Sequence, residues 1–194
     1  ASDQDCLSVR GHLIALAGSD SEWPGGNIQV WDNLSKKHTV ITRSSFASEL
    51  RNAISADACT QLVRGFLEEI LHGCKSASQL AEMQDNGQYS NDYALCIDAR
   101  SIYDAISRDG EVLTGSDPSL TMHVKSLKDI VLRGEITQFV WIDNRDMVAD
   151  GLTKGKVDRA ALLAAAQGRW AVQHPCLTFA SKKLVTSSGH EKTT

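Results

Sequence analysis

Three carboxylate residues occupy positions in the sequence from which metal-dependent chemistry is possible. Asp98 directly follows the apolar run 93–97, which is typical of a central strand covered on both faces. Asp150 follows a second β-prone run, 136–142, and lies where a helical pattern begins, while Glu49 lies near the start of a long helical pattern. In α/β folds, sites gather at the carboxyl ends of strands, so these three side chains could meet at one edge of a sheet.

Clustered carboxylates favour divalent cations. They repel one another, so such a cluster is tolerable only if cations fill it. All-oxygen ligands suit magnesium or manganese better than zinc, and two such ions could activate a water molecule and stabilise the leaving oxygen in phosphodiester cleavage. Each residue also has a purely structural explanation: Asp150 could favour a helix start, Glu49 a solvated helix face, and Asp98 a turn. Spacing alone does not bring the three together.

The elements that must position these residues follow from periodicity. Positions 7–17 and 28–42 predict an antiparallel strand pair, the second strand either continuous or interrupted by the basic segment 35–38. A helix is predicted over 44–72, with Phe46, Leu50, Ile54, Leu62, Phe66 and Ile70 facing the core. The remaining predicted elements are a polar surface loop 76–91, strands 93–97 and 136–142, and helices 101–106, 120–132 and about 147–167.

This order of elements predicts an α/β layered domain with a mixed sheet. We expect one domain over residues 1–170 of the 194, followed by a disordered polar tail over 171–194. No apolar run approaches the ~18 residues that a membrane span needs.

Composition narrows the partners and the compartment. Apolar residues make up 42% and charged residues 23%, and the net charge is -4, so any nucleic-acid contact must come from a local basic patch. Lys36, Lys37, Arg43 and Lys154 are candidates to hold phosphates, although Lys36 and Lys37 could equally form a solvated face. The five cysteines are odd in number and form no C-x-x-C pair. That pattern argues against disulfides and structural zinc, and it predicts an intracellular location, cytoplasmic or nuclear.

Five segments carry a family resemblance. Ala149-Asp150-Gly151-Leu152-Thr153-Lys154 matches the pattern Ala-Asp-x-x-Thr-Lys, and residues 42–50 resemble Ser-Ser-Thr-Glu-Ala-Glu-Tyr, whose second Glu corresponds to Glu49. Residues 95–102 resemble Cys-Asp-Asn-Gln-Ser-Ala, residues 30–38 are similar to Trp-x-Ser-Lys-Lys-Gln, and residues 8–13 resemble Ser-x-x-Gly-Tyr. In their order along the chain, these segments resemble the ribonuclease H domain of copia-type retrotransposon polyproteins, over roughly residues 7–169.

The resemblance implies a fold, an activity and partners. It implies a ribonuclease H-like mixed sheet with helices on both faces. Glu49, Asp98 and Asp150 would be catalytic, holding two magnesium (or manganese) ions. The activity would be hydrolysis of the RNA strand of RNA–DNA hybrids, and the protein partner an upstream reverse transcriptase domain of the same polyprotein.

The chain also departs from the family pattern. The family's first strand carries a further metal-binding Asp well ahead of the Gly that corresponds to Gly11, whereas this chain has only ten residues before Gly11. We therefore expect the first strand and its Asp to be missing, with Asp3 or Asp5 as an open substitute and an inactive fragment as one outcome. The alternative function is a non-catalytic nucleic-acid-binding or scaffold remnant of a degenerate retrotransposon polyprotein.

Overall fold

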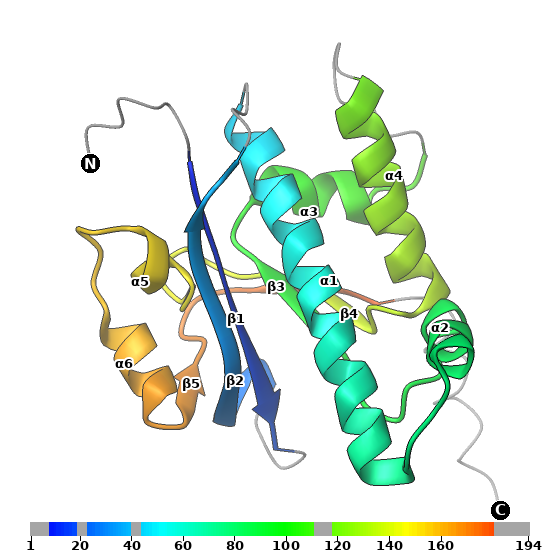
Figure 1. Ribbon diagram of the computed structural model, residues 1–194. Helices are drawn as coiled ribbons and strands as arrows, with labels where there is room; N and C mark the ends of the chain where they lie inside the picture. Colours follow the sequence, from blue (N-terminus) through cyan, green and yellow to red (C-terminus); the bar gives the residue numbers. More distant parts are fainter. Residues whose placement is uncertain (1–7, 19–22, 40–43, 111–117, 181–194) are drawn as a thin grey trace, which may run out of the picture. The chain divides into compact units, whose positions relative to one another are not determined.

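The computed structural model describes residues 8–18, 23–39, 44–110 and 118–180 (Figure 1). Within these ranges the protein is a mixed α/β structure, as predicted, with six helices and six strands. The strands form two three-stranded sheets rather than the one mixed sheet that was expected. The chain divides into two compact units. Unit 1 comprises Ala1–Ala56, Ile97–Ala99 and Ile142–Cys176, and unit 2 comprises Asp57–Cys96, Arg100–Trp141 and Leu177–Thr194.

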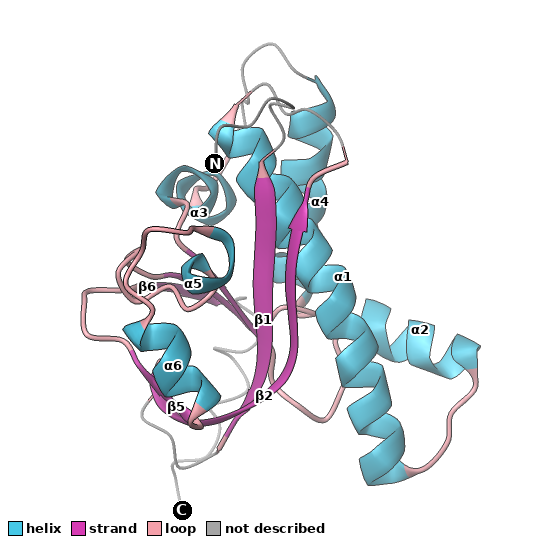
Figure 2. Ribbon diagram, turned by 60° about the vertical axis from the view of Figure 1, so that its left-hand side comes forward, coloured by secondary structure: helices cyan, strands magenta, loops and turns pink. Residues whose placement is uncertain are grey.

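A long hairpin is the centre of unit 1. Strands β1 (Val9–Ala17) and β2 (Gly25–Lys37) pair antiparallel, as predicted, and β5 (Arg169–Ala171) pairs with the other edge of β2 (Figures 1 and 2). The basic segment does not interrupt β2, because Lys36 and Lys37 keep their register opposite Arg10 and Val9. Exposed strand positions accept lysine without loss of backbone pairing.

Helices cover both faces of this hairpin. Successive strand residues point to opposite faces, and the Arg10 side chain points toward helix α1 (Ser45–His72), donating from Nη1 to Ser55 Oγ at 3.1 Å. Gly11 faces the other side, where α5 (Asp150–Thr153) lies (Figure 2). Ser35, the partner of Gly11 in β2, donates from Oγ to the Leu152 carbonyl oxygen on the same side, at 2.8 Å.

The helix expected from about 147 to 167 is instead two short helices. Helix α5 ends at Thr153, and the backbone of the next residue, Lys154, is extended (φ -107°, ψ 118°). Helix α6 covers Ala160–Ala166, and the amide of its first residue, Ala160, donates to Asp158 Oδ1 at 2.9 Å. Gly155 favours a break at this point because glycine has a flexible backbone. Asp158 favours one because its carboxylate accepts a hydrogen bond from an amide at the start of the next helix. The alanine-rich pattern predicted helix type correctly but hid this interruption.

Unit 2 is built on a second sheet of order β3 (Ala94–Ile97), β4 (Gln138–Trp141) and β6 (Leu177–Ala180), in which β4 and β6 are antiparallel. Strand β6 lies inside the range 171–194 that was expected to be a disordered tail. Helices α3 (Arg100–Ser107) and α4 (Pro118–Arg133) agree with the prediction. Tyr103 stacks on Phe139 with ring centroids 5.9 Å apart, and the fully buried core side chains include Ile102, Ile106, Val124, Leu127, Val131, Phe139 and Val140.

A helix replaces part of the loop predicted over 76–91. Helix α2 (Ala77–Asp85) begins with a capping box, in which Ser76 accepts from the Gln79 amide and the Gln79 side chain accepts from the Ser76 amide. Two of the backbone amides that lack an acceptor within the helix are therefore hydrogen-bonded to nearby side chains. The apolar periodicity of the sequence could not predict α2, because the segment is polar and α2 buries none of its own residues.

The second half of α1 reverses the predicted burial. Leu50, in the first half, is fully buried as expected, but Leu62, Phe66 and Ile70 are 76%, 56% and 58% exposed. The buried side chains of the second half are polar, namely Asp57, Gln61, Arg64 and Glu68. For this half of the helix, the prediction of an apolar inner face was wrong.

Hydrogen bonds within unit 2 explain the reversal. Arg64 donates to the Glu135 carbonyl oxygen at 2.8 Å and to Asn91 Oδ1 and the Asn91 carbonyl oxygen, each at 3.0 Å. Glu68 accepts from the amide and the hydroxyl of Ser90, at 3.1 and 2.9 Å. Buried polar groups are tolerated when they are paired in this way. Across the described ranges of the chain, no helix is long and apolar enough to cross a membrane.

Candidate active site

All three predicted carboxylates lie in unit 1. Glu49 is in the second turn of α1, Asp98 directly follows β3, and Asp150 is the first residue of α5. They come from segments about 50 residues apart, as the numbering of the sequence shows, so only the fold can bring them together.

Gly11 positions α5, and therefore Asp150. A Cβ atom at residue 11 would lie 2.3 Å from Thr153 Cγ2 and 3.2 Å from the Leu34 carbonyl oxygen. Only glycine allows α5 to approach β1 this closely. Gly151, next to Asp150, allows a similar approach to α6, because a Cβ there would lie 2.9 Å from Leu162 Cβ. The glycine and threonine of the family-like segments thus have a packing role in this chain.

The same strand residue anchors α1, and therefore Glu49. Asn52, three residues after Glu49, donates from Nδ2 to the Gly11 carbonyl oxygen at 3.0 Å. The hydroxyls of Ser48 and Ser8 are 2.7 Å apart. Helices α1 and α5 are therefore both fixed to β1 at Gly11.

The segment that leads to Asp150 is held by a buried aspartate that the sequence reasoning missed. Asp146 is only 4% exposed, and its Oδ2 accepts from the amides of Gln173 and His174 at 3.1 and 2.9 Å. The His174 ring nitrogen Nδ1 is 3.0 Å from both carboxylate oxygens. The available signal was a third Asp close to Asp143 and Asp150 in a turn-forming stretch. Its role is to hold the segment between β4 and α5.

The three carboxylates influence one another electrostatically. Burial, and then the negative charges of Asp98 and Asp150, raise the pKa of Glu49. Burial and the charge of Asp150 likewise raise the pKa of Asp98. Like charges on neighbouring groups act in this way. The fold therefore brings the three predicted residues near enough for their charges to interact, and we call Glu49, Asp98 and Asp150 the acidic cluster.

Lys154 supplies the opposite charge. Its Nζ lies 2.7 Å from Asp150 Oδ2, and the side chains of Lys154 and Asp150 are 50% and 16% exposed. Burial alone would lower the pKa of Lys154, but the hydrogen bond to Asp150 and the charges of Asp150, Asp98 and Glu49 outweigh it and raise the pKa. The sequence placed Lys154 among phosphate-binding residues, and the structure places it beside the acidic cluster.

The acidic cluster has the donor chemistry for magnesium or manganese. Carboxylate oxygens are the ligands that these hard cations prefer, and the raised pKa values of Glu49 and Asp98 mark a place where a cation would be stabilising. Within the described ranges, no three Asp, Glu, His or Cys side chains are grouped closely enough to hold an ion as they stand. Glu49, Asp98 and Asp150 would have to draw together around the ion.

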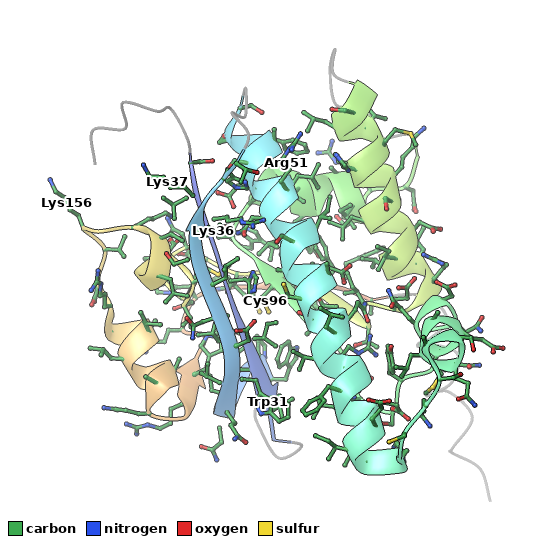
Figure 3. All side chains as sticks on the ribbon, in the orientation of Figure 1. Trp31, Lys36, Lys37, Arg51, Cys96 and Lys156 are labelled. Carbon is green, nitrogen blue, oxygen red and sulfur yellow. The ribbon has the colours of Figure 1, made fainter. Side chains whose placement is uncertain are left out.

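The other predicted phosphate-binding residues are divided by the strand alternation. Lys36 lies opposite Arg10, on the α1 face of β2, and Lys37 lies on the other face. Both are exposed, and Figure 3 labels them near the end of β2. Arg43, and the open substitutes Asp3 and Asp5, lie outside the described residues.

Comparisons with known proteins identify no relative of this chain. No protein-family model, no curated protein and no solved structure matches this chain.

Proposed function

We propose that this chain is a ribonuclease H-like domain of the copia-type retrotransposon kind that hydrolyses the RNA strand of RNA–DNA hybrids with divalent metal ions. The observation that carries the proposal is the acidic cluster. Three carboxylates from separate segments of unit 1 interact through their charges, and they stand at the positions that the family-like motifs assign to metal ligands. Helices on both faces of the β1–β2 hairpin also agree with a ribonuclease H-like arrangement.

The acidic and the basic residues of the site would have different roles. Glu49, Asp98 and Asp150 would hold the ions through their carboxylate oxygens. Bound there, magnesium or manganese would activate a water molecule and stabilise the leaving oxygen. Lys154 would release Asp150 as metal enters and would remain beside the cluster, where its ammonium group could meet a phosphate of the substrate. The upstream partner would be the reverse transcriptase domain of the same polyprotein.

Hybrid cleavage tests the proposal. The chain is incubated with a labelled RNA–DNA hybrid and magnesium, alongside the variants Asp98→Asn and Asp150→Asn. Loss of a direct metal ligand should reduce the rate at least 100-fold, since even indirect partners of metal ligands are worth roughly 10- to 100-fold. The matched control is Asp109→Asn, an exposed carboxylate of unit 2. Absence of cleavage in the wild type, or cleavage unchanged by Asp98→Asn, would exclude the catalytic proposal.

A second candidate function has one observation in its favour. The ion pair between Lys154 and Asp150 partly neutralises the acidic cluster without a metal ion. This suits a non-catalytic remnant that binds nucleic acid or acts as a scaffold. Binding of the hybrid without any cleavage, at several magnesium concentrations, would favour this function over the enzyme.

A further inference from the structure

A group of basic side chains gathers at the end of the hairpin where β1 begins and β2 ends. Arg10 and Lys36 are direct cross-strand partners and therefore lie on the same face, the one that carries α1. His38 follows two residues after Lys36, and its amide donates to the Ser8 carbonyl oxygen at 2.8 Å, so the hairpin geometry continues there. Arg51 of α1 lies at the same end of unit 1 as Lys36 (Figure 3). We call these four residues the basic cluster.

Arg10 and Arg51 are close enough to His38 for their charges to act on it. Burial lowers the pKa of His38, and the positive charges of Arg10 and Arg51 lower it further. Asp32 acts on the pKa of His12, further along β1, but it is not among the groups that act on His38. Among the described residues, no carboxylate forms an ion pair with Arg10, Lys36 or Arg51, the positive charges of the cluster.

Several nitrogen atoms of the cluster have no hydrogen-bond partner in the part of the chain that the structure describes. His38 is 94% buried, being 6% exposed, and its Nε2 has no acceptor or donor opposite it. The Nε atoms of Arg10 and Arg51 are likewise buried and unpaired. Buried donors that lack an acceptor are unfavourable by about 1–3 kcal/mol each. Buried donors without an acceptor, in a group of positively charged side chains, match an anion that carries several acceptor oxygens.

We propose that Arg10, Lys36, His38 and Arg51 form a binding site for a phosphate group. The two guanidinium groups and the lysine would supply the charge, and His38 would add a hydrogen bond from beneath. The phosphate could be a free ion or a phosphodiester of a nucleic-acid strand, and the second case rests on the proposed function. Neither Arg10 nor Arg51 belongs to the residues that the sequence had marked for phosphate contact.

Phosphate binding is measured first, with inorganic phosphate and without any divalent metal. Phosphate should raise the melting temperature of the wild type more than sodium chloride does at equal ionic strength. Calorimetric titration should show that Arg51→Gln and Lys36→Gln each weaken phosphate binding about 10-fold, the usual scale of one charged hydrogen bond. Lys125→Gln, an exposed lysine of α4, is the charge-matched control and should bind like the wild type.

The outcomes separate cleanly. If phosphate stabilises the wild type no more than chloride does, or if Arg51→Gln and Lys36→Gln bind like Lys125→Gln, the site does not exist. Lys36 is exposed, so its variant keeps the test decisive even if Arg51→Gln unfolds.

A second measurement identifies the source of the phosphate. Binding of an RNA–DNA hybrid is followed by fluorescence anisotropy in EDTA over a salt series. If the site holds a nucleic-acid phosphodiester, Lys36→Gln and Arg51→Gln each reduce the slope of log K against log salt by about 1. An unchanged slope with intact phosphate binding assigns the site to the free ion. Asp98→Asn should leave phosphate binding intact, so failure of this site and failure of the hydrolase proposal are distinguishable.

Discussion

Asp98 is the residue whose replacement reports most directly on the acidic cluster. Its ordinary pKa of 3.8 is raised in the folded protein by burial and by the charge of Asp150. A carboxyl group with a raised folded-state pKa binds its proton more tightly in the folded state than in the unfolded state. Its contribution to stability is therefore full below pH 3.8 and is lost as the pH rises through the raised value.

The Asp98→Asn variant should consequently be more stable than the wild type at pH 7. We expect a gain of about 0.5–2 kcal/mol, the range of a single stabilising substitution. The gain should shrink as the pH falls through the raised pKa of Asp98 and should vanish well below pH 3.8, where the wild-type carboxyl group is neutral in both the folded and the unfolded state. Urea unfolding at several pH values measures this difference. A variant that is less stable than the wild type at pH 7 would show that Asp98 is not under electrostatic strain.

At the scale of elements, the approach of α5 to β1 depends on Gly11. Gly11→Ala should destabilise the protein by about 1–3 kcal/mol, the usual effect of overpacking, because the new Cβ would meet Thr153 Cγ2 at 2.3 Å. Thr153→Ser removes that methyl group and should recover part of the loss in the double variant. Chemical denaturation of all four proteins completes the cycle. Simple addition of the two single effects would contradict the contact.

Substitutions in the second half of α1 test whether its polar side chains, rather than its apolar ones, are the buried ones. Arg64→Leu should destabilise the protein by about 2–4 kcal/mol, since the Asn91 and Glu135 oxygens would lose their buried donor. Leu62→Ser should change stability by less than about 0.5 kcal/mol, because the leucine is 76% exposed. Thermal unfolding of the two variants makes the comparison. A larger loss for Leu62→Ser than for Arg64→Leu would mean that the apolar face of α1 is the buried one.

The elements also show what the sequence could and could not predict. Period-2 and period-3.6 patterns identified β1, β3, β4, α1, α3 and α4, because these elements bury an apolar face or run. The pattern failed for the second half of α1, where Arg64 and Glu68 are buried by partners distant in the sequence. It also missed α2, which is specified by its Ser76–Gln79 capping box rather than by an apolar stripe.

The candidate site could be predicted only in part. Residue types and motif order indicated Glu49, Asp98 and Asp150, and the fold brings their charges together. The role of Asp146 in holding His174 could not be predicted, because it depends on the return of the chain after β5. Lys154 lies four residues after Asp150, a spacing at which helical side chains interact, so their ion pair could have been predicted. The sequence motif led instead to the prediction that Lys154 holds a substrate phosphate.

At the scale of the whole molecule, a net charge of -4 must be reconciled with the nucleic-acid substrate that we propose. Within unit 1 the charges are segregated. The acidic cluster lies where α1 and α5 are anchored to Gly11, and the basic cluster lies where β2 ends. A local basic patch can hold a phosphate backbone even on an acidic protein, since screening confines each patch to a Debye length of about 8 Å at physiological salt.

The central claim is that Glu49, Asp98 and Asp150 form one divalent-cation site. Manganese titration followed by electron paramagnetic resonance tests it directly, because bound Mn²⁺ loses the sharp signal of the free ion. The wild type and the exposed-site control Asp109→Asn should deplete free Mn²⁺ to the same extent. Asp98→Asn and Asp150→Asn should bind it at least 10-fold more weakly, the lower end of the loss seen even for indirect partners of metal ligands, which is roughly 10- to 100-fold. Equal depletion by all four proteins, or none by the wild type, would contradict the claim.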